Sequence, residues 1–340
     1  MDIIKYQKSG TPKGITSICS SNKFVLETAM LNAKSNDNAL LIESTSNQVD
    51  QFGGYSGMTP EMFRNYVWQI ADEFNYQKEK ILLGGDHLGP NVWQSESVDS
   101  AMQKAEDQIR SYVKAGFTKI HLDTSFPLGN ENEKSLSPEL ITERATILCE
   151  AAEDAQEKSN GNFSKPLYVI GTDVPKPGGA MDDEDYLEVT PIEELQETIA
   201  MTKSALLKRG LEDAWDRVIA VVVQPGVEFT DTKVFEYDRM KTSGLKSKIE
   251  EEERIVLEAH STDYQTKESL RQMVEDHFGI LKVGPWLTFA FRESVFALEA
   301  IEKELFSSKK GITPSQLSRI VIEEMNNNPK YWQNHYRGNN

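Results

Sequence analysis

Short apolar runs alternate along the chain with longer amphipathic segments. The runs are rich in Ile, Leu and Val, and each is short enough to predict a strand. The predicted strands cover residues 14–20, 39–45, 80–83, 119–125, 167–173, 217–224, 254–260 and 278–284. Helices are predicted over residues 22–34, 97–115, 137–158, 191–209 and 288–305, and another begins at 59–60. Almost wholly apolar strands between helices indicate a parallel sheet that is buried on both faces.

Eight strand–helix units without a dividing linker predict one (β/α)8 TIM barrel, which we place at residues 1–310. A doubly wound open sheet is the alternative fold. No glycine-rich dinucleotide fingerprint follows the first strand, and the chain contains no P-loop. Residues 311–340 add one more helix and an aromatic tail with Tyr331, Trp332 and Tyr336. We expect this segment to pack on the barrel or, failing that, on a partner subunit.

The composition is that of a soluble globular protein, with 38% hydrophobic and 27% charged residues. A formal charge of −17 argues against nucleic acids and anionic membranes as partners, although a local site could still bind a phosphorylated sugar. The N-terminus lacks the apolar core of a signal peptide, and no apolar run is long enough for a membrane span. The two cysteines, Cys19 and Cys149, form no disulfide framework, so we expect a cytoplasmic location.

An Asp–His pair, Asp86-His87, follows the third predicted strand within the segment 84–91 (GGDHLGPN). The two glycines before the pair are expected to let the backbone turn where the strand ends. The pair would then supply a proton-transfer group and a metal ligand at one place. The alternative is an ordinary turn in which Asp86 caps the following helix.

Polar side chains gather where the predicted strands end, although the strand interiors are apolar. In a (β/α)8 barrel the carboxyl ends of the strands form the active-site face. The polar residues at these ends are Cys19, Ser20, Glu43, Asp86, His87, His121, Asp123, Asp173, Gln224, Glu228, His260, Asp263 and Lys282. Two further histidines, His277 and His335, are interpreted as structural or solvated. A polar rim occurs on any barrel, so the pattern supports a site without defining it.

Three of these residues could converge on a divalent metal. His87, Glu228 and His260 follow three different strands. A catalytic metal takes about three protein ligands and keeps one position open. His121 and Asp123 compete as ligands, because the alternation of side chains along a strand puts both on one face.

Six segments carry a resemblance to a known family: 43–49 (ESTSNQV), 51–55 (QFGGY), 84–91 (GGDHLGPN), 222–229 (VVQPGVEF), 258–265 (EAHSTDYQ) and 281–285 (LKVGP). They resemble the tagatose-1,6-bisphosphate aldolase accessory subunits, the Z subunits of galactitol and N-acetylgalactosamine catabolism. The similarity runs from about Gly14 to Tyr336. It implies a barrel related to the class II aldolases, and a partner, the zinc-dependent catalytic subunit that such a chain stabilises and activates.

Two further points concern the family. Its members have also carried the label of tagatose 6-phosphate kinase, but nothing in the sequence resembles a nucleotide site. Members usually continue beyond the position of Asn340 with another helical segment, so interface functions in that segment are expected to be missing.

The resemblance to true class II aldolases assigns roles residue by residue. Their strand-three Asp–His pair, a proton donor and a zinc ligand, matches Asp86 and His87. Their strand-four aspartate matches Asp123, and their two other zinc histidines match Glu228 and His260. The resemblance therefore implies a divalent metal, zinc, held by two histidines and a glutamate.

The phosphate loop of the class II aldolases is altered in this chain. The resemblance places Ser261, Thr262, Asp263 and Tyr264 where those enzymes have glycines that bring backbone amides to phosphate oxygens. A carboxylate at Asp263 would repel phosphate. This departure argues against cleavage of a sugar bisphosphate by this chain.

Two functions therefore compete. In the first, the chain is an accessory subunit that stabilises the catalytic aldolase and performs little chemistry itself. In the second, it is a metal-dependent ketose 4-epimerase or aldolase that acts on tagatose, fructose or tagaturonate. The metal would polarise the ketose carbonyl, and Asp86 would take the C4 hydroxyl proton. Cleavage of C3–C4 and recombination after rotation of the aldehyde would invert C4.

The second hypothesis names a set of residues for each role. The catalytic residues would be Asp86, Asp123 and Glu43. The substrate-binding residues would be Ser20, Gln48, Asn91, His121, Asp173, Gln224, Ser261, Asp263 and Lys282. In both hypotheses we expect an oligomer.

Overall fold

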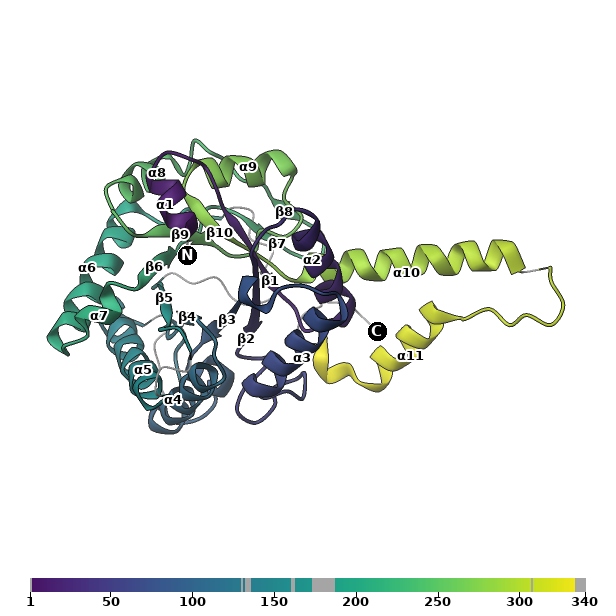
Figure 1. The fold of residues 1–340 in the computed structure, drawn as a ribbon, viewed down its shortest axis with the longest axis horizontal. Coiled ribbons are helices and arrows are strands. Elements are labelled where there is room, and N and C mark those ends of the chain that lie inside the picture. The colour runs from purple at the N-terminus through teal and green to yellow at the C-terminus, as the bar shows by residue number, and fades with distance from the viewer. Residues whose placement is uncertain are drawn as a thin grey trace.

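Eight parallel strands close into a barrel in the computed structural model, which describes residues 2–129, 131, 136–159, 163–172, 187–306 and 308–333 (Figure 1). The strands are β1 (Ile15–Cys19), β2 (Leu40–Thr45), β3 (Ile81–Leu88), β4 (Lys119–Leu122), β5 (Leu167–Ile170), β6 (Val218–Val222), β9 (Val256–Ala259) and β10 (Phe278–Val283). Strands β1 and β10 pair in parallel and complete the ring. The predicted (β/α)8 barrel is confirmed, and the open-sheet alternative is wrong.

Strand β3 continues beyond the expected end at Leu83. It pairs with β2 from Leu40↔Ile81 to Thr45↔Asp86, so Asp86 lies within the strand. The glycines allow close packing here instead of a turn. A Cβ on Gly84 would lie 2.7 Å from the Glu43 side chain. The expected turn at the two glycines is therefore wrong, as is the reading of Asp86 as a helix cap.

Helices cover the outside of most of the barrel, and their ends follow the sequence signals. Hydroxyl or amide side chains cap α2 (Lys23–Ser35), α3 (Pro60–Glu73), α4 (Val98–Lys114), α5 (Pro138–Lys158) and α9 (Lys267–Glu275). Pro60 and Pro138 lie in the first turns of their helices, where a missing N–H costs nothing. The remaining outer helices are α6 (Ile192–Lys208), α7 (Glu212–Trp215) and α8 (Ser243–Glu250).

Several small elements were not predicted. Helix α1 (Asp2–Lys8) precedes the barrel, and β7 (Glu228–Phe229) and β8 (Val234–Phe235) form a short antiparallel hairpin after β6. Single 3-10 turns are η1 (Lys78–Lys80) and η2 (Pro90–Trp93). These elements lie between the barrel units and leave the order of the strands unchanged.

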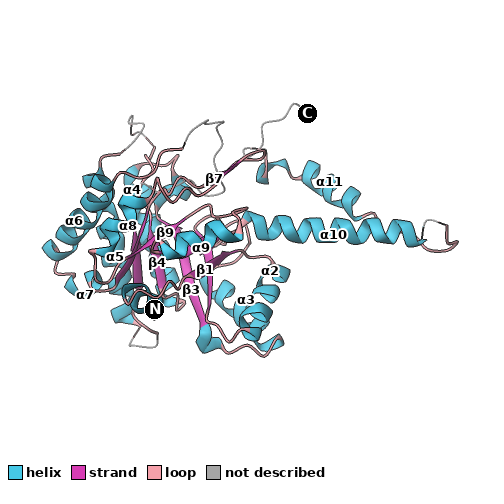
Figure 2. Ribbon diagram, turned by 90° about the horizontal axis from the view of Figure 1, so that it is seen from above, coloured by secondary structure: helices cyan, strands magenta, loops and turns pink. Residues whose placement is uncertain are grey.

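The C-terminal helices form an arm that extends away from the barrel (Figures 1 and 2). It consists of α10 (Pro285–Phe306), α11 (Leu317–Asn327) and η3 (Pro329–Tyr331). Helix α10 begins three residues before the predicted start, and α11 folds back along it. The indole N–H of Trp332 donates to the carbonyl of Met325, so this aromatic residue bonds back onto α11. His335 and Tyr336 lie outside the described residues.

No helix in the described ranges is long and apolar enough to cross a membrane. The core of the protein is the layer between the strands and the outer helices, where large side chains such as Phe63, Tyr112, Phe117 and Phe278 are buried. The barrel interior differs from this layer, because it contains charged side chains toward the carboxyl ends of the strands.

Candidate active site

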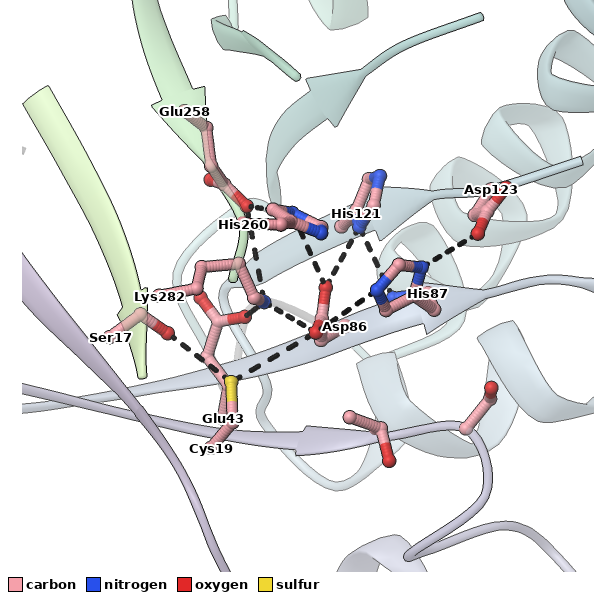
Figure 3. Close-up of polar contacts among 12 residues, drawn as sticks. Ser17, Cys19, Glu43, Asp86, His87, His121, Asp123, Glu258, His260 and Lys282 are labelled. Carbon is pink, nitrogen blue, oxygen red and sulfur yellow. Dashed lines mark hydrogen bonds and ion pairs between the residues drawn. The ribbon is translucent and has the colours of Figure 1, made fainter. Parts of the chain in front are cut away.

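Buried polar side chains converge inside the barrel near the carboxyl ends of the strands (Figure 3). They come from β1, β2, β3, β4, β9 and β10 and from the residues that follow these strands, so residues far apart in sequence meet at one place. The central residues are Glu43, Asp86, His87, Lys119, His121, Asp123, Glu258, His260 and Lys282, which we call the barrel cluster.

Asp86 is the hub of the barrel cluster. One carboxylate oxygen lies 2.8 Å from Nδ1 of His121, and the other lies 2.5 Å from Nζ of Lys282. The ring nitrogens Nε2 of His87 and His260 lie 3.7 and 4.0 Å from the same carboxylate. Burial alone would raise the pKa of Asp86, but His87 and Lys282 and the bond with His121 hold this pKa well below its ordinary value. Asp86 is therefore an ionised carboxylate held among three imidazoles.

Two buried lysines lie between two buried glutamates. Nζ of Lys119 lies 2.6 Å from Glu43 and 2.9 Å from Glu258, and Nζ of Lys282 lies 2.7 Å from Glu43. Burial would lower the pKa of Lys282, but Asp86 and the glutamates raise it well above its ordinary value. Lys119 and Glu258 were not among the predicted site residues. The available signal was a charged residue inside each of two otherwise apolar strands.

His87 has a strained backbone conformation, and its side chain is held by the carboxylate of Asp123. Its φ is +49°, in the left-handed region that a residue with a Cβ rarely adopts, and such strain concentrates at functional sites. Its Nδ1 lies 2.7 Å from Asp123, whose other oxygen accepts from the hydroxyl of Ser125. Burial would raise the pKa of Asp123, but the bond with His87 lowers it to about 2. A carboxylate behind an imidazole is the usual partner of a metal-binding histidine, and it leaves Nε2 of His87 for a ligand.

His121 and His260 each have one ring nitrogen without a partner among the described residues. Nδ1 of His121 lies 2.8 Å from Asp86, and Nε2 of His260 lies 3.1 Å from Glu258. Because the Glu258 carboxylate only accepts, Nε2 of His260 carries the proton and a lone pair remains on Nδ1. Nδ1 of His121 lies between the Asp86 carboxylate and the backbone N–H of His87, which donates to it at 3.2 Å. Nε2 of His121 and Nδ1 of His260 are both buried. Burial lowers the pKa of His260 to about 3, so its imidazole is neutral.

The arrangement fits a divalent cation. Asp86, His121, Glu258 and His260 can each offer a ligand atom such that all of these atoms lie within 4.8 Å of one another. The three imidazole rings are mutually 4.8 to 5.2 Å apart. Two orphaned, buried nitrogens in such a place are unfavourable unless a metal or a ligand satisfies them.

The formal charges lead to the same conclusion. The barrel cluster contains four carboxylates but only two ammonium groups. Lys119 and Lys282 pair with Glu43, Asp86 and Glu258, and Asp123 pairs with His87. Burial would lower the pKa of His87, but Asp86 and Asp123 raise it. Even with this imidazole protonated, the barrel cluster carries an excess of negative charge in a dry interior. A bound divalent cation would neutralise this excess.

Glu228 does not belong to the four-residue ligand group of Asp86, His121, Glu258 and His260. One of its oxygens accepts the backbone N–H of Phe229 at 3.0 Å, and its side chain also bonds with Ser261. Burial raises the pKa of Glu228 to about 7. The ligand group contains Glu258 and His121 where the sequence predicted Glu228 and His87, while His260 belongs to both sets. Glu228 as a metal ligand therefore stays a prediction.

Asp263 occupies the start of α10. Its Oδ1 accepts the backbone N–H groups of Gly284 at 3.1 Å and of Trp286 at 2.7 Å. In many barrels the loops after the seventh and eighth strands and a helix N-terminus bind a phosphate at this place. Here a carboxylate of the chain itself holds these amides. Burial raises the pKa of Asp263 to about 6 despite those two bonds.

The other predicted substrate-binding residues mainly hold loops at the barrel mouth. Ser20 accepts from the N–H of residue 22, Gln48 from that of residue 45, and Gln224 from those of residues 226 and 227. Asn91 accepts from the hydroxyl of residue 46. Asp173 lies outside the described residues. His277 bonds with Gln7 and Glu250 and is structural, as expected.

Comparisons with known proteins concern the family and the fold of the chain. Residues 1–340 match the model of a family described as D-tagatose-1,6-bisphosphate aldolase subunit GatZ/KbaZ-like. The chain is also similar to the crystal structure of a probable tagatose 6 phosphate kinase from Sinorhizobium meliloti. The sequence identity is 44% and the TM-score is 0.85, and the match covers 96% of this chain and 78% of that chain.

Two aldolase structures are more distant. A fructose-bisphosphate aldolase from Campylobacter jejuni is 12% identical with a TM-score of 0.58, over 93% of this chain and 83% of that chain. A putative fructose-1,6-biphosphate aldolase from Coccidioides immitis is 15% identical with a TM-score of 0.54, over 95% and 90%. At these identities the similarity concerns the fold alone.

Proposed function

Since the chain belongs to the GatZ/KbaZ-like family of D-tagatose-1,6-bisphosphate aldolase subunits, we propose that it is itself a metal-dependent ketose 4-epimerase or aldolase. The observation that carries the proposal is the barrel cluster, where an ionised Asp86 lies among three imidazoles, two of which have a buried ring nitrogen without a partner in the described part of the chain. A protein that only stabilises a partner has no need of such a set. Buried charges of this kind cost folding free energy.

The residues of the barrel cluster can take separate roles in a retro-aldol reaction. Imidazoles and carboxylates of the barrel cluster would hold a divalent metal, and zinc is the first metal to test. The metal would act as a Lewis acid on the ketose carbonyl and its neighbouring hydroxyl. Asp86 accepts the proton of the C4 hydroxyl as the C3–C4 bond breaks, giving a three-carbon enediolate and an aldehyde. Rotation of the aldehyde and re-formation of the bond returns the proton from Asp86 and inverts C4.

Lys282 and Asp123 support this chemistry from different sides. The ammonium of Lys282 lies 2.5 Å from Asp86 and keeps that carboxylate ionised, and it also offers a positive charge to the developing enediolate. Asp123 orients His87 through the bond at Nδ1. Glu43 and Glu258 hold the two lysines in place.

The state of Asp263 favours an unphosphorylated substrate. The amides of Gly284 and Trp286 are already bonded to this carboxylate, so they are not available to phosphate oxygens. A phosphate brought there would also meet a negative charge at neutral pH. Tagatose, fructose or tagaturonate are therefore better candidates than a sugar bisphosphate.

A second candidate function is that of an accessory subunit that stabilises a catalytic tagatose-bisphosphate aldolase subunit. The description of the matched family supports it. The first experiment separates the two candidates. It measures bound metal and D-fructose to D-tagatose conversion on the purified chain without any partner.

We expect bound divalent metal and turnover, and a loss of turnover of about 10²–10⁴-fold in Asp86→Asn, the usual worth of a general acid–base. Asp213→Asn, at an exposed aspartate in α7, is the matched control and should keep full activity. A metal-free, inert chain that raises the activity of a catalytic aldolase subunit would contradict the proposal and support the accessory role.

The metal ligands can be tested separately from turnover. We expect His121→Ala and His260→Ala to lower the bound metal measured by elemental analysis. Glu228→Gln decides whether the sequence-based ligand set needs its glutamate. Loss of metal in Glu228→Gln but not in Glu258→Gln would favour that set, and the reverse result would favour the four-residue ligand group.

A further inference from the structure

The arm exposes an apolar stripe that nothing in the described structure covers. Leu298, Ile301 and Leu305 of α10 are 64%, 55% and 58% exposed, and their spacing places them on one face of the helix. Ile322 of α11 is also exposed. Glu299 is the single buried residue of this 22-residue helix. A helix of this length in water depends on packing of its apolar face for stability.

The barrel wall has a matching gap between α9 and α2. A cavity of about 500 Å³ lies over the outer face of β1 and β10 and is lined by Ile15, Thr16, Leu270, Val274, Leu281 and Val283, among others. We call it the β1–β10 groove. Thr16 is exposed although it lies in a barrel strand. In a (β/α)8 barrel the helix after the eighth strand covers this part of the wall.

Helix α10 follows the eighth strand but leaves the wall after its first turns. Trp286 and Leu287 line the groove, and Phe291 stacks on Phe24 of α2 with ring centroids 4.8 Å apart. Beyond this point α10 extends away from the barrel (Figure 2). The outer face of β1 and β10 therefore lacks a covering helix, and most of α10 lacks a surface to pack on.

We infer that two copies of this chain form a swapped dimer, in which the α10 stripe of each copy packs into the β1–β10 groove of the other. A second copy is the occupant because each chain supplies what the other lacks, and exchange of one identical element closes with two-fold symmetry. The net charges are weakly complementary. Lys267, Arg271 and Glu275 line the groove, and Glu302, Lys303 and Glu304 flank the stripe.

The size of the interface follows from the part of α10 that leaves the barrel. Residues 292–306 span about 22 Å at 1.5 Å per residue, and a strip about 10 Å wide along them covers roughly 220 Å². Two arms and two grooves would together bury on the order of 900 Å², which is the size of a small, reversible interface. The inference depends only on this surface, so it holds or fails independently of the proposed chemistry.

The test is the mass of the full chain in solution, by light scattering after size-exclusion chromatography. We expect twice the chain mass of 38.4 kDa for the unchanged protein. The arm variant Leu298→Glu/Leu305→Glu and the groove variant Thr16→Arg should both halve this mass and keep the circular dichroism of the folded barrel. Met240→Glu, at a residue that is 80% exposed elsewhere, is the matched control and should stay dimeric.

A covalent link identifies the exchange itself. A mixture of Thr16→Cys and Leu298→Cys chains should give a cross-linked dimer with a short bismaleimide, whereas Met240→Cys mixed with Thr16→Cys should not. A monomeric unchanged protein, or a dimer that survives either the arm or the groove variant, would overturn the inference.

Discussion

The barrel cluster and the C-terminal arm depart from the usual distribution of residues in opposite directions. The barrel cluster buries charge, since the side chains of Lys119 and Glu258 are no more than 1% exposed. The arm exposes apolar groups, since more than half of the surface of Leu298 is accessible. Ordinary folding would place both sets the other way round.

The contrast between the buried charges and the exposed apolar groups shows where this molecule departs from the arrangement that favours folding alone. Buried ion pairs contribute little net stability compared with apolar residues, so stability alone does not explain the barrel cluster. Exposed apolar stripes cost solubility, so the arm is retained for what it contacts. Each departure from the usual pattern is accounted for by one of the two proposals, chemistry inside the barrel and association outside it.

The largest expected effect comes from removing one buried charge. Lys119→Met removes the closest ammonium group of Glu43 and Glu258 and leaves Lys282 as their remaining lysine. Breaking a buried pair by removing one partner typically costs about 3–5 kcal/mol of the free energy of unfolding. Urea unfolding measures the loss. A cost below about 1 kcal/mol would mean that the glutamates of the barrel cluster do not depend on this lysine.

The matched control for that substitution is Lys165→Met. Lys165 pairs with Asp213 on the surface, where the two side chains are 59% and 82% exposed. Exposed pairs contribute about 0–1 kcal/mol, so this change should hardly move the unfolding curve. A similar loss in both variants would remove the contrast between buried and exposed charges.

A smaller effect on the free energy of unfolding is expected at Asp263, and the direction of its pKa shift determines whether stability rises or falls with pH. Burial raises the pKa of this carboxyl to about 6 in the folded protein, above its unfolded value. The folded state therefore binds the proton more tightly, and the contribution to stability is present at low pH and is lost as the pH rises through 6. Between about pH 5 and pH 8 the loss amounts to about 1.4 kcal/mol.

Asp263→Asn removes this titration and keeps an amide oxygen for the N–H groups of Gly284 and Trp286. We expect the difference in unfolding free energy between the unchanged protein and the variant to shift by about 1.4 kcal/mol in favour of the unchanged protein from pH 8 to pH 5. Urea unfolding at both pH values measures it. A difference that stays constant would show that the carboxyl titrates at its ordinary pKa.

The sequence predicted the barrel and much of the site because both depend on local patterns. Apolar runs and helix caps define the eight units, and side-chain alternation places His121 and Asp123 on one face. The same alternation links Glu258 to His260, but motif matching favoured Glu228. Partners that a motif does not contain, such as Lys119, depend on strand register, which a single sequence does not reveal. The direction of α10 depends on tertiary packing for the same reason.

The smallest expected effect concerns the arm and completes the comparison. Ile109 in α4 is fully buried against the barrel, so Ile109→Ala should cost about 2–5 kcal/mol of unfolding free energy at any protein concentration. Leu298→Ala should cost less than about 0.5 kcal/mol in dilute protein, since its side chain contacts little of its own barrel.

If α10 packs into a second copy, the cost of Leu298→Ala should increase with protein concentration, because association stabilises only the unchanged chain fully. Unfolding curves across a concentration series measure both. A large, concentration-independent cost for Leu298→Ala would mean that α10 packs on its own barrel in solution, and the arm would then be part of one folded unit.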